Sequence, residues 1–277
     1  DHFSKNVFDT KNVNNMFQMF QGCILLESVP LFDTRNVIYA NNMFRYCSAL
    51  KSVPQFDFSN AIDTSWMFYD CQELDNVNFL NTNKIINAEG MFYRCFKLSS
   101  VPNMDYSSIV NIAQMFCGCK ELTEIVLPDT KNTTDWGAFA STCANLERVE
   151  INASSGIDFV QAFRNCSKLK TISLGGTKNA VSFDRTFTDC SALESIYGLD
   201  VSSVNKFSNI FTRCNALKYV ELTSSNADKL VTAVNNLPTH AGVAENDYIV
   251  DISNCAAEVI NAASSLARAG WTIKTTK

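Results

Sequence analysis

The motif M-F-x-x-C-x-x-L-x-x-V first occurs as Met19-Phe20-Gln21-Gly22-Cys23-Ile24-Leu25-Leu26-Glu27-Ser28-Val29. It recurs along the 277 residues with a period of 24 and a single step of 23. A fixed period of this length is typical of one supersecondary unit stacked on copies of itself. We therefore predict an elongated solenoid. The cysteines that mark its repeats are Cys23, Cys47, Cys71, Cys95, Cys119, Cys143, Cys166, Cys190 and Cys214.

Two apolar columns accompany the cysteines. We expect both to stack in one continuous core, because each buried large side chain contributes about 1.5–3 kcal/mol and neighbouring repeats share their buried faces. The aromatic column is Phe20, Phe44, Phe68, Phe92, Phe116, Phe139, Phe163, Phe187 and Phe211. The aliphatic column is Leu26, Leu50, Leu74, Leu98, Leu122, Leu146, Leu169, Leu193 and Leu217.

Each repeat divides into three parts. Leu146-x-x-Val149-x-Ile151 alternates with period 2, which indicates a short strand. A polar turn follows in each repeat, as in 33–36, and then apolar residues recur three apart, as in 204–210. That spacing predicts a short α- or 3₁₀-helix behind the strands. The predicted fold is an α/β solenoid of about nine 24-residue repeats, with short parallel strands plus short α/3₁₀ helices.

The two halves of the repeat region differ. Prolines follow the strand positions at Pro30, Pro54 and Pro102, and proline lacks the N–H that a central strand donates. We expect only short strand pairing there, and ordinary alternating strands from Glu124 onward. The 23-residue step, between 143 and 166, predicts a local kink or bulge.

The period ends after Leu222, so we divide the chain into a solenoid over 1–222 and C-terminal capping units over 223–277. In the capping units, helix start and stop signals predict helices at 226–237 and 255–269 and strands at 248–252 and 271–274. Gly270 is expected to end the second helix in a left-handed conformation. These βα-like units would cover the open end of the stack.

The cysteine column predicts neither disulfides nor a metal site. Neighbouring cysteines would lie about 4.8 Å apart with parallel side chains, which is wider than a disulfide requires. Small buried apolar residues are the preferred interpretation. Cys117 lies off the column and is expected to expose its thiol; with Cys119 it forms only a weak C-x-C metal motif. Recurrent turn aspartates could attract calcium, but turn capping is favoured: Asp9, Asp33, Asp57, Asp105, Asp129 and Asp200.

Composition narrows the function classes. The net charge is −5 and no Lys/Arg cluster stands out, which disfavours a nucleic-acid surface. No run of 18 apolar residues exists, so no transmembrane segment is expected. The two histidines, His2 and His240, belong to no catalytic triad or metal motif; His240 is interpreted as a solvated loop residue. We predict no catalytic residues, no cofactor and no enzymatic activity.

The repeat unit with its F-D-T-x-N-V approach resembles the BspA-type leucine-rich repeats of bacterial surface proteins. The variant at 162–169 and the closing G-W-T-I at 270–273 resemble the same family. The resemblance implies a leucine-rich-repeat solenoid, export, and display outside the cell or on its surface. It also implies adhesion-type binding of host proteins or neighbouring cells, with no shared catalytic residues. The chain shows no anchor and opens in the middle of a repeat, so we infer a truncated product whose upstream segment is absent.

Within this repeat class, strand residues that face away from the core line an extended concave sheet. Aromatic and arginine side chains are favoured interface anchors, so Arg148, Tyr197 and Tyr219 are the leading contacts. The alternative is that these residues merely solvate a sheet face. A second candidate surface lies at the back, around Tyr46, Tyr69, Tyr93 and Arg94. The predicted ligand-binding set on the concave face is Glu124, Arg148, Glu150, Tyr197, Tyr219 and Glu221.

The sequence thus predicts a non-enzymatic binding module that engages an extracellular protein or glycan. We expect a monomer, although the sequence does not fix the oligomeric state. The alternative is a structural spacer or assembly segment of a larger surface or tail-fibre protein. A spacer would be repetitive on every face, whereas a binding module would carry non-repeating residues on one face.

Overall fold

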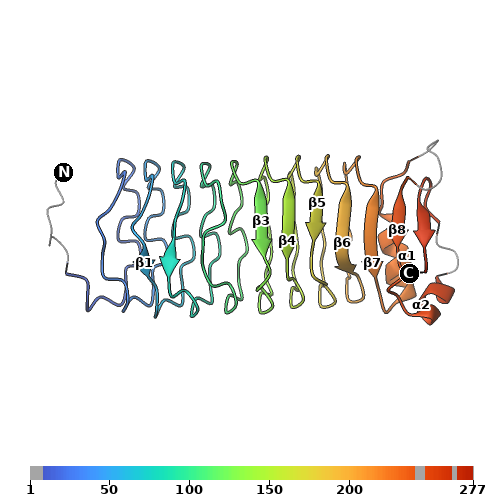
Figure 1. Ribbon diagram of the computed structural model, residues 1–277, viewed down its shortest axis with the longest axis horizontal. Coiled ribbons are helices and arrows are strands. Elements are labelled where there is room, and N and C mark those ends of the chain that lie inside the picture. Colours follow the sequence, from blue (N-terminus) through green and yellow to red (C-terminus); the bar gives the residue numbers. More distant parts are fainter. Residues whose placement is uncertain (1–8, 241–246, 264–266, 277) are drawn as a thin grey trace.

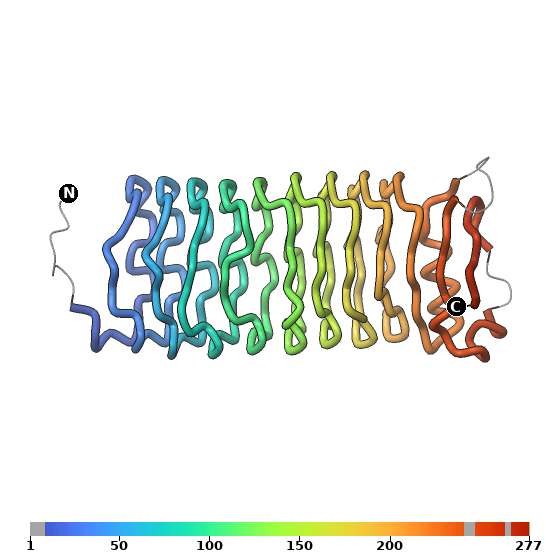
Figure 2. Tube along the Cα trace, in the orientation of Figure 1, coloured from blue at the N-terminus to red at the C-terminus, as the bar shows by residue number. Residues whose placement is uncertain are grey.

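The chain winds into a single row of stacked coils with its ends at opposite ends of the row (Figures 1 and 2). This computed structural model describes residues 9–240, 247–263 and 267–276. One apolar core runs through the stack, from Met16 in the first coil to Trp271 near the C-terminus. The predicted repeat solenoid is confirmed.

The front wall of the stack is a seven-stranded parallel sheet in the order β3-β4-β5-β6-β7-β8-β9. Buried and outward residues alternate along each strand, as in β3, where Ile125 and Leu127 are buried. Ile125 pairs with Val149 and Val149 with Ile172, so each core position lies beside its equivalent one coil on. The strands are β3 (Glu124–Leu127), β4 (Arg148–Ile151), β5 (Thr171–Ser173), β6 (Ser195–Asp200), β7 (Tyr219–Thr223), β8 (Ile249–Asp251) and β9 (Thr272–Lys274).

Strand pairing before Glu124 is short, as predicted. Two two-residue strands, β1 (Phe56–Asp57) and β2 (Phe79–Leu80), pair in parallel. Isolated bridges such as Ser52 with Asn76 replace longer ladders elsewhere in this half. The prolines of these repeats cannot donate to a neighbouring strand, which accounts for the brevity.

The short helices expected at the back of each repeat are not formed in the coils that the structure describes; turns replace them. Asn42 and Tyr46 have φ of 58° and 64°, in the left-handed region that no α-helix contains. The intervening N–H groups bond between coils, as where Phe44 donates to the Met67 carbonyl over 2.9 Å. The three-residue apolar spacing therefore belongs to a hydrogen-bonded ladder of turns.

The phenylalanine column stacks as predicted. The Phe44 ring lies 5.3 Å from Phe20 and 5.4 Å from Phe68, with interplanar angles of 3° and 6°. The column cysteines from Cys47 to Cys214 are buried, and none of them is in a disulfide. Cys23 is exposed, contrary to the expectation of a fully buried column, because no described coil packs on the outer side of the first one.

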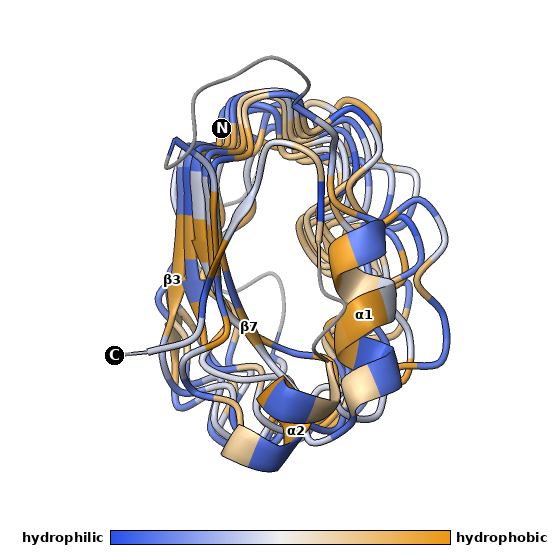
Figure 3. Cartoon of the chain, turned by 90° about the vertical axis from the view of Figure 1, so that its right-hand side faces the viewer, coloured by the Kyte–Doolittle hydropathy of each residue, from blue (hydrophilic) through white to orange (hydrophobic). Residues whose placement is uncertain are grey.

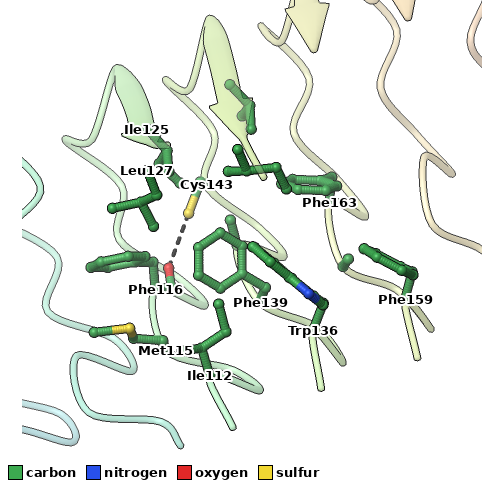
Figure 4. Close-up of a cluster of buried hydrophobic side chains, with 14 of the residues drawn as sticks. Ile112, Met115, Phe116, Ile125, Leu127, Trp136, Phe139, Cys143, Phe159 and Phe163 are labelled. Carbon is green, nitrogen blue, oxygen red and sulfur yellow. Dashed lines mark hydrogen bonds between the residues drawn. The ribbon is translucent and has the colours of Figure 1, made fainter. Parts of the chain in front are cut away.

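One rung departs from the pattern (Figure 4). The Phe92 N–H donates to the Met115 carbonyl, whereas the Phe116 N–H donates to the Phe139 carbonyl. Phe139 thus takes the backbone position of Met115, and Ala140 takes that of Phe116. The expectation that Phe139 continues the stacked column is wrong: its ring is perpendicular to Phe116, at 74°.

The Phe139 ring itself fills the volume that Ala140 leaves, since it lies 5.5 Å from Phe116 and 6.1 Å from Phe163. Trp136 is fully buried and packs edge-on against Phe139 at 5.1 Å. The kink predicted at the 23-residue step is not present in the strands, because Arg148 pairs with Thr171 without a shift. The sheet register shifts instead within β6, between Ile196 and Leu199.

The C-terminal segment adds two strands and two helices. β8 and β9 extend the same sheet. Helix α1 (Ala227–Asn235) begins after Asn226, whose side chain accepts from the Lys229 N–H at 3.1 Å, and it turns an apolar side inward (Figure 3). Helix α2 (Ala257–Ala262) is shorter than predicted, and 264–266 lie outside the described residues. The division of the chain at 222 stays a prediction.

Candidate functional site

We call the outward surface of β3–β9 the sheet face. All six residues predicted from the sequence lie on it. Each comes from a position that alternates with a buried core residue, which follows from the two-residue period of a strand. Glu124, Arg148 and Tyr197 are exposed, whereas Glu150, Tyr219 and Glu221 are half-buried.

The first group on this face is a charge cluster. Parallel register places Arg148 beside Glu124, and the Arg148 guanidinium bonds to the carboxylates of Glu124 and Glu150. The hydrogen bond to Glu124 is the main cause that raises the pKa of Arg148. Exposed pairs of this kind contribute little to stability. The predicted anchor Arg148 is therefore already occupied by its own neighbours.

Small hydroxyl residues separate the charge cluster from the next group. Arg148 pairs with Thr171 and Thr171 with Ser195; Ser173 lies between Glu150 and Tyr197. These side chains are half-buried. The charge cluster and the tyrosines beyond it are therefore two distinct places on one surface.

The second group is a pair of tyrosines. The rings of Tyr197 and Tyr219 lie 5.2 Å apart at 36°, and Tyr197 is 41% exposed. The Tyr219 hydroxyl donates to Asp251 Oδ2 over 3.2 Å. Burial, followed by the charge of Asp251, raises the pKa of Tyr219 to about 12. The pair is thus an exposed aromatic surface whose inner ring is held by a carboxylate.

Asp251 connects this pair to the last strand. Its Oδ2 also accepts from Lys274 Nζ at 2.8 Å. Burial alone would raise the pKa of Asp251, but hydrogen bonds from Lys274 and Ser253 outweigh it and lower the pKa to about 2. Asp251 and Lys274 were not predicted as site residues, since the 24-residue spacing that located the others ends before them.

A bulge in β6 shapes the same region. Gly198 has φ of 70°, and a Cβ there would lie 3.0 Å from the Gly176 nitrogen, so only glycine fits. The Gly198 N–H donates to Glu221 Oε2 over 3.0 Å, and Glu221 Oε1 accepts from Asn254 at 2.9 Å. Glu221 therefore braces the bulge. We name Tyr197, Tyr219, Glu221, Asp251 and Lys274 the tyrosine cluster.

The second candidate surface, at the back, is packed against itself. The rings of Tyr69 and Tyr93 stack at 4.8 Å, and Tyr46 meets Tyr69 edge-on at 5.1 Å. The Arg45 guanidinium lies 4.8 Å from the centre of the Tyr69 ring. Arg94 pairs with an aspartate, Asp70, at 3.1 Å. This stacking leaves Tyr69 and Tyr93 half-buried, while Tyr46 remains 38% exposed.

Groups that could support catalysis or metal binding are few. Within the described ranges, no cluster of three His, Cys, Asp or Glu side chains could hold a metal ion. His240 is not a solvated loop residue as predicted: it stacks on Tyr248 at 3.8 Å, and burial lowers its pKa. Cys117 is half-buried rather than exposed, and burial raises its pKa. His2 lies outside the described residues.

The stacked coils, the parallel sheet and the repeated F-x-x-C-x-x-L core define a leucine-rich-repeat solenoid. Residues 53–159 and 89–218 match the family described as "BspA type Leucine rich repeat region (6 copies)". The chain belongs to this family. Residues 2–103 also match a family described as a Mycoplasma protein of unknown function, DUF285.

Two solved structures are similar to this chain at low identity. A leucine-rich repeat protein from Bacteroides ovatus is 19% identical over 71% of this chain and 61% of that one, with a TM-score of 0.34. The chain thus spans less than two thirds of that relative. A leucine rich cell surface protein from Faecalibacterium prausnitzii is 17% identical over 91% and 79%, with a TM-score of 0.31.

Two further findings concern curated relatives and membrane-spanning helices. No curated protein matches the chain. In the part of the chain that the structure describes, no helix combines the length and apolarity needed to cross a membrane.

Proposed function

We propose that this chain is a binding module that engages an extracellular protein or glycan through the sheet face, with the tyrosine cluster as its centre. The observation that carries the proposal is the non-repeating aromatic pair on the sheet face, in which Tyr197 is 41% exposed and packs on the half-buried Tyr219. Repeat proteins of this class commonly use such extended surfaces for binding. Membership of a family of bacterial surface proteins supports a location outside the cell or on its surface.

Preorganisation supports the choice of the tyrosines over the charge cluster. The Asp251 carboxylate fixes the Tyr219 hydroxyl, and the bulge at Gly198 is braced by Glu221. A partner that docks here orders few side chains, which reduces the entropic cost of association. Arg148, by contrast, must give up bonds to two carboxylates before it can contact a partner. We infer that Arg148 contributes to the edge of the contact surface.

The proposed role is non-enzymatic, and the chemistry of the same surface supports it. The tyrosine cluster contains two carboxylates, an ammonium group and two phenols. The carboxylate of Asp251 is held ionised by Lys274 rather than placed to exchange protons at neutral pH, and that of Glu221 is bonded to Gly198 and Asn254. A general acid or base works best with a pKa near the operating pH. The chemistry of the cluster suits recognition.

The test is a binding screen of the purified chain against immobilised extracellular-matrix proteins and a glycan array. For any hit, the double variant Y197A/Y219A should lower the affinity at least tenfold while the melting temperature stays the same. The matched control is Tyr46→Ala, because Tyr46 is 38% exposed on the other face. Equal affinity of the wild type and the double variant would exclude the sheet face.

The early coils favour a second role for their own half of the chain. Their sheet positions carry uncharged residues such as Ser28, Ser52 and Asn76, and their strands are short. That surface offers few distinctive contacts. We propose that the coils before Glu124 act as a spacer that positions the sheet face, and that 223–277 cap the stack. Deleting two whole early repeats should leave the affinity of any hit unchanged.

A further inference from the structure

A row of β-branched side chains, all isoleucine or valine except Thr134, runs along the back wall, outside the core. One position per coil supplies it, and the main chain links the coils there, as where the Ile86 N–H donates to the Ile62 carbonyl at 2.9 Å. Five members are between 39 and 47% exposed. Contiguous exposed apolar surface of this kind marks an interaction site more often than scattered residues do. We call Ile38, Ile62, Ile86, Val110, Thr134, Ile157 and Val181 the apolar row.

The surface is hollowed beside this row. A groove of about 660 Å³ has one wall formed by the apolar row itself. Polar side chains complete the lining, so the groove offers both apolar and hydrogen-bonding groups. The lining residues are Ile62, Ile86, Val110 and Thr134 from the row, together with Asn83, Lys84, Ser108 and Asn132.

Charges of opposite sign flank the row on its two sides. The chain crosses the row in extended form, with bridges to the neighbouring coils, so residues before and after a row member lie on opposite flanks. In sequence, lysines precede a member of the row by two or three residues, and carboxylates follow a member by one to three residues. The three coils that carry both are Lys84 with Glu89, Lys131 with Asp135, and Lys178 with Asp184.

These flanking charges have neutral partners: Lys84 donates to Asn60, Glu89 accepts from Asn111, and Asp135 accepts from the Gly137 N–H. Among the residues that the structure describes, none of the six forms an ion pair. Burial, together with the charges of Asp135 and Asp63, raises the pKa of Glu89, so the acidic flank repels itself. Asp184 Oδ1 is buried without a hydrogen bond. The row therefore has an acidic flank and a basic flank, and neither is neutralised by ion pairs within the chain. Such a surface is complementary to a second one whose basic flank lies against its acidic flank, and the reverse.

We propose that the apolar row binds a second copy of this chain, with the two solenoids parallel and a two-fold axis along the row. Rotation about that axis places the basic flank of each copy against the acidic flank of the other. An antiparallel pair would instead bring like charges together, which is unfavourable. A two-fold axis parallel to the stack places each coil level with the same coil of the second copy. Lys84 therefore faces Glu89 of the second copy, and Lys178 faces Asp184 of the second copy. Each contact occurs twice.

The size of the surface fits a reversible dimer. Six steps from Ile38 to Val181 at about 4.8 Å give a length of roughly 29 Å. The six residues from the lysine to the far carboxylate span at most about 20 Å, so each copy buries on the order of 600 Å². Specific interfaces begin at about 1,200 Å² in total. This dimer departs from the monomer expected from the sequence.

The first experiment measures mass in solution by sedimentation equilibrium. The wild type should dimerise at micromolar to submillimolar concentration, and more weakly in 1 M salt. K84E/K178E and E89K/D184K should each be monomeric at the same concentrations. Their equimolar mixture should dimerise again, because each carries the charges that the other lacks. This rescue also shows that both variants are folded.

The second experiment determines orientation. In a C23S background, which removes the exposed native thiol, I62C should form a disulfide-linked homodimer on mild oxidation. The parallel two-fold axis places Ile62 beside its own copy. An I62C chain that cross-links only to I157C would indicate an antiparallel pair and overturn the proposal. A monomeric wild type, or a dimer that survives both charge reversals, would overturn it as well.

Discussion

The Sγ–H group of Cys71 donates to the main-chain carbonyl of Phe44, one coil earlier, over 3.1 Å. The same bond recurs from Cys47 to Cys214, with an alanine carbonyl as acceptor only at Cys166. The thiol therefore fills apolar space and joins consecutive coils. Serine would make the bond but bury a more polar group, and alanine would fill less space.

Burial predicts which cysteines react. Desolvation raises the pKa of Cys47 to about 12, and it raises the pKa of Cys71, Cys95 and Cys119 as well. The reactive thiolate is then scarce at pH 8. A thiol-specific reagent should label Cys23 within minutes in the native state. The half-buried thiols should react slowly, and the column from Cys47 to Cys214 should react only after denaturation. Rapid native labelling of several column cysteines would contradict a single continuous core.

Removing one thiol from the middle of the column should weaken the whole stack. Cys95→Ala deletes a fully buried sulfur and its bond to the Phe68 carbonyl, so unfolding should become easier by about 1–2 kcal/mol. Urea denaturation followed by circular dichroism measures the loss. Cys23→Ala is the matched control, since its side chain is exposed, and should change stability by less than about 0.5 kcal/mol. Equal effects would argue against a role for the column.

The irregular rung predicts strong coupling between three residues. Ala140→Phe alone forces a second ring into the space that Trp136 and Phe139 fill, and should destabilise the chain by about 1–3 kcal/mol. Adding W136I and F139M reproduces the arrangement of Ile112, Met115 and Phe116 and should restore most of the loss. Melting temperatures of the single, double and triple variants give the interaction energy. Additive effects would mean that Phe139 does not occupy the position assigned to it.

Acid stability should depend on Asp251. Its pKa in the folded chain is about 2, below the ordinary 3.8, so its contribution is present at neutral pH and is lost as pH falls from about 4 to about 2. The contribution is at most about 2 kcal/mol. Denaturation measured from pH 7 to pH 2 should show the wild type losing its advantage over Asp251→Asn across that window. Parallel profiles for the two proteins would show that Lys274 does not hold this carboxylate.

The core could be predicted from the sequence because every coil repeats the same contacts. A column such as Phe44, Phe68 and Phe92 is visible as spacing alone, and stacking follows from it. The back wall could not be predicted in the same way. Apolar residues three apart occur both in helices and in tight turns, so the spacing does not distinguish them. The left-handed backbone at Tyr46 could not be predicted either, because that position is not a glycine.

The candidate site shows the same division. Register placed Tyr197 and Tyr219 on neighbouring strands, and their rings do lie in contact. The role of Glu221 could not be foreseen, because it depends on a bulge at Gly198 that breaks the register locally. Asp251 was missed because its strand follows a helix, so the spacing that located the earlier rungs no longer applies.

The hydrogen bonds between coils all run along the length of the molecule, on the front wall and on the back. A force applied between the two ends therefore stretches these hydrogen bonds along their own direction and breaks them one coil at a time. It does not shear all the strands of the sheet at once. Under tension the coils should detach one after another, beginning with the coil whose side chains are least packed. Under such tension, each detached coil would release about 24 residues of extended chain before the remaining coils separate.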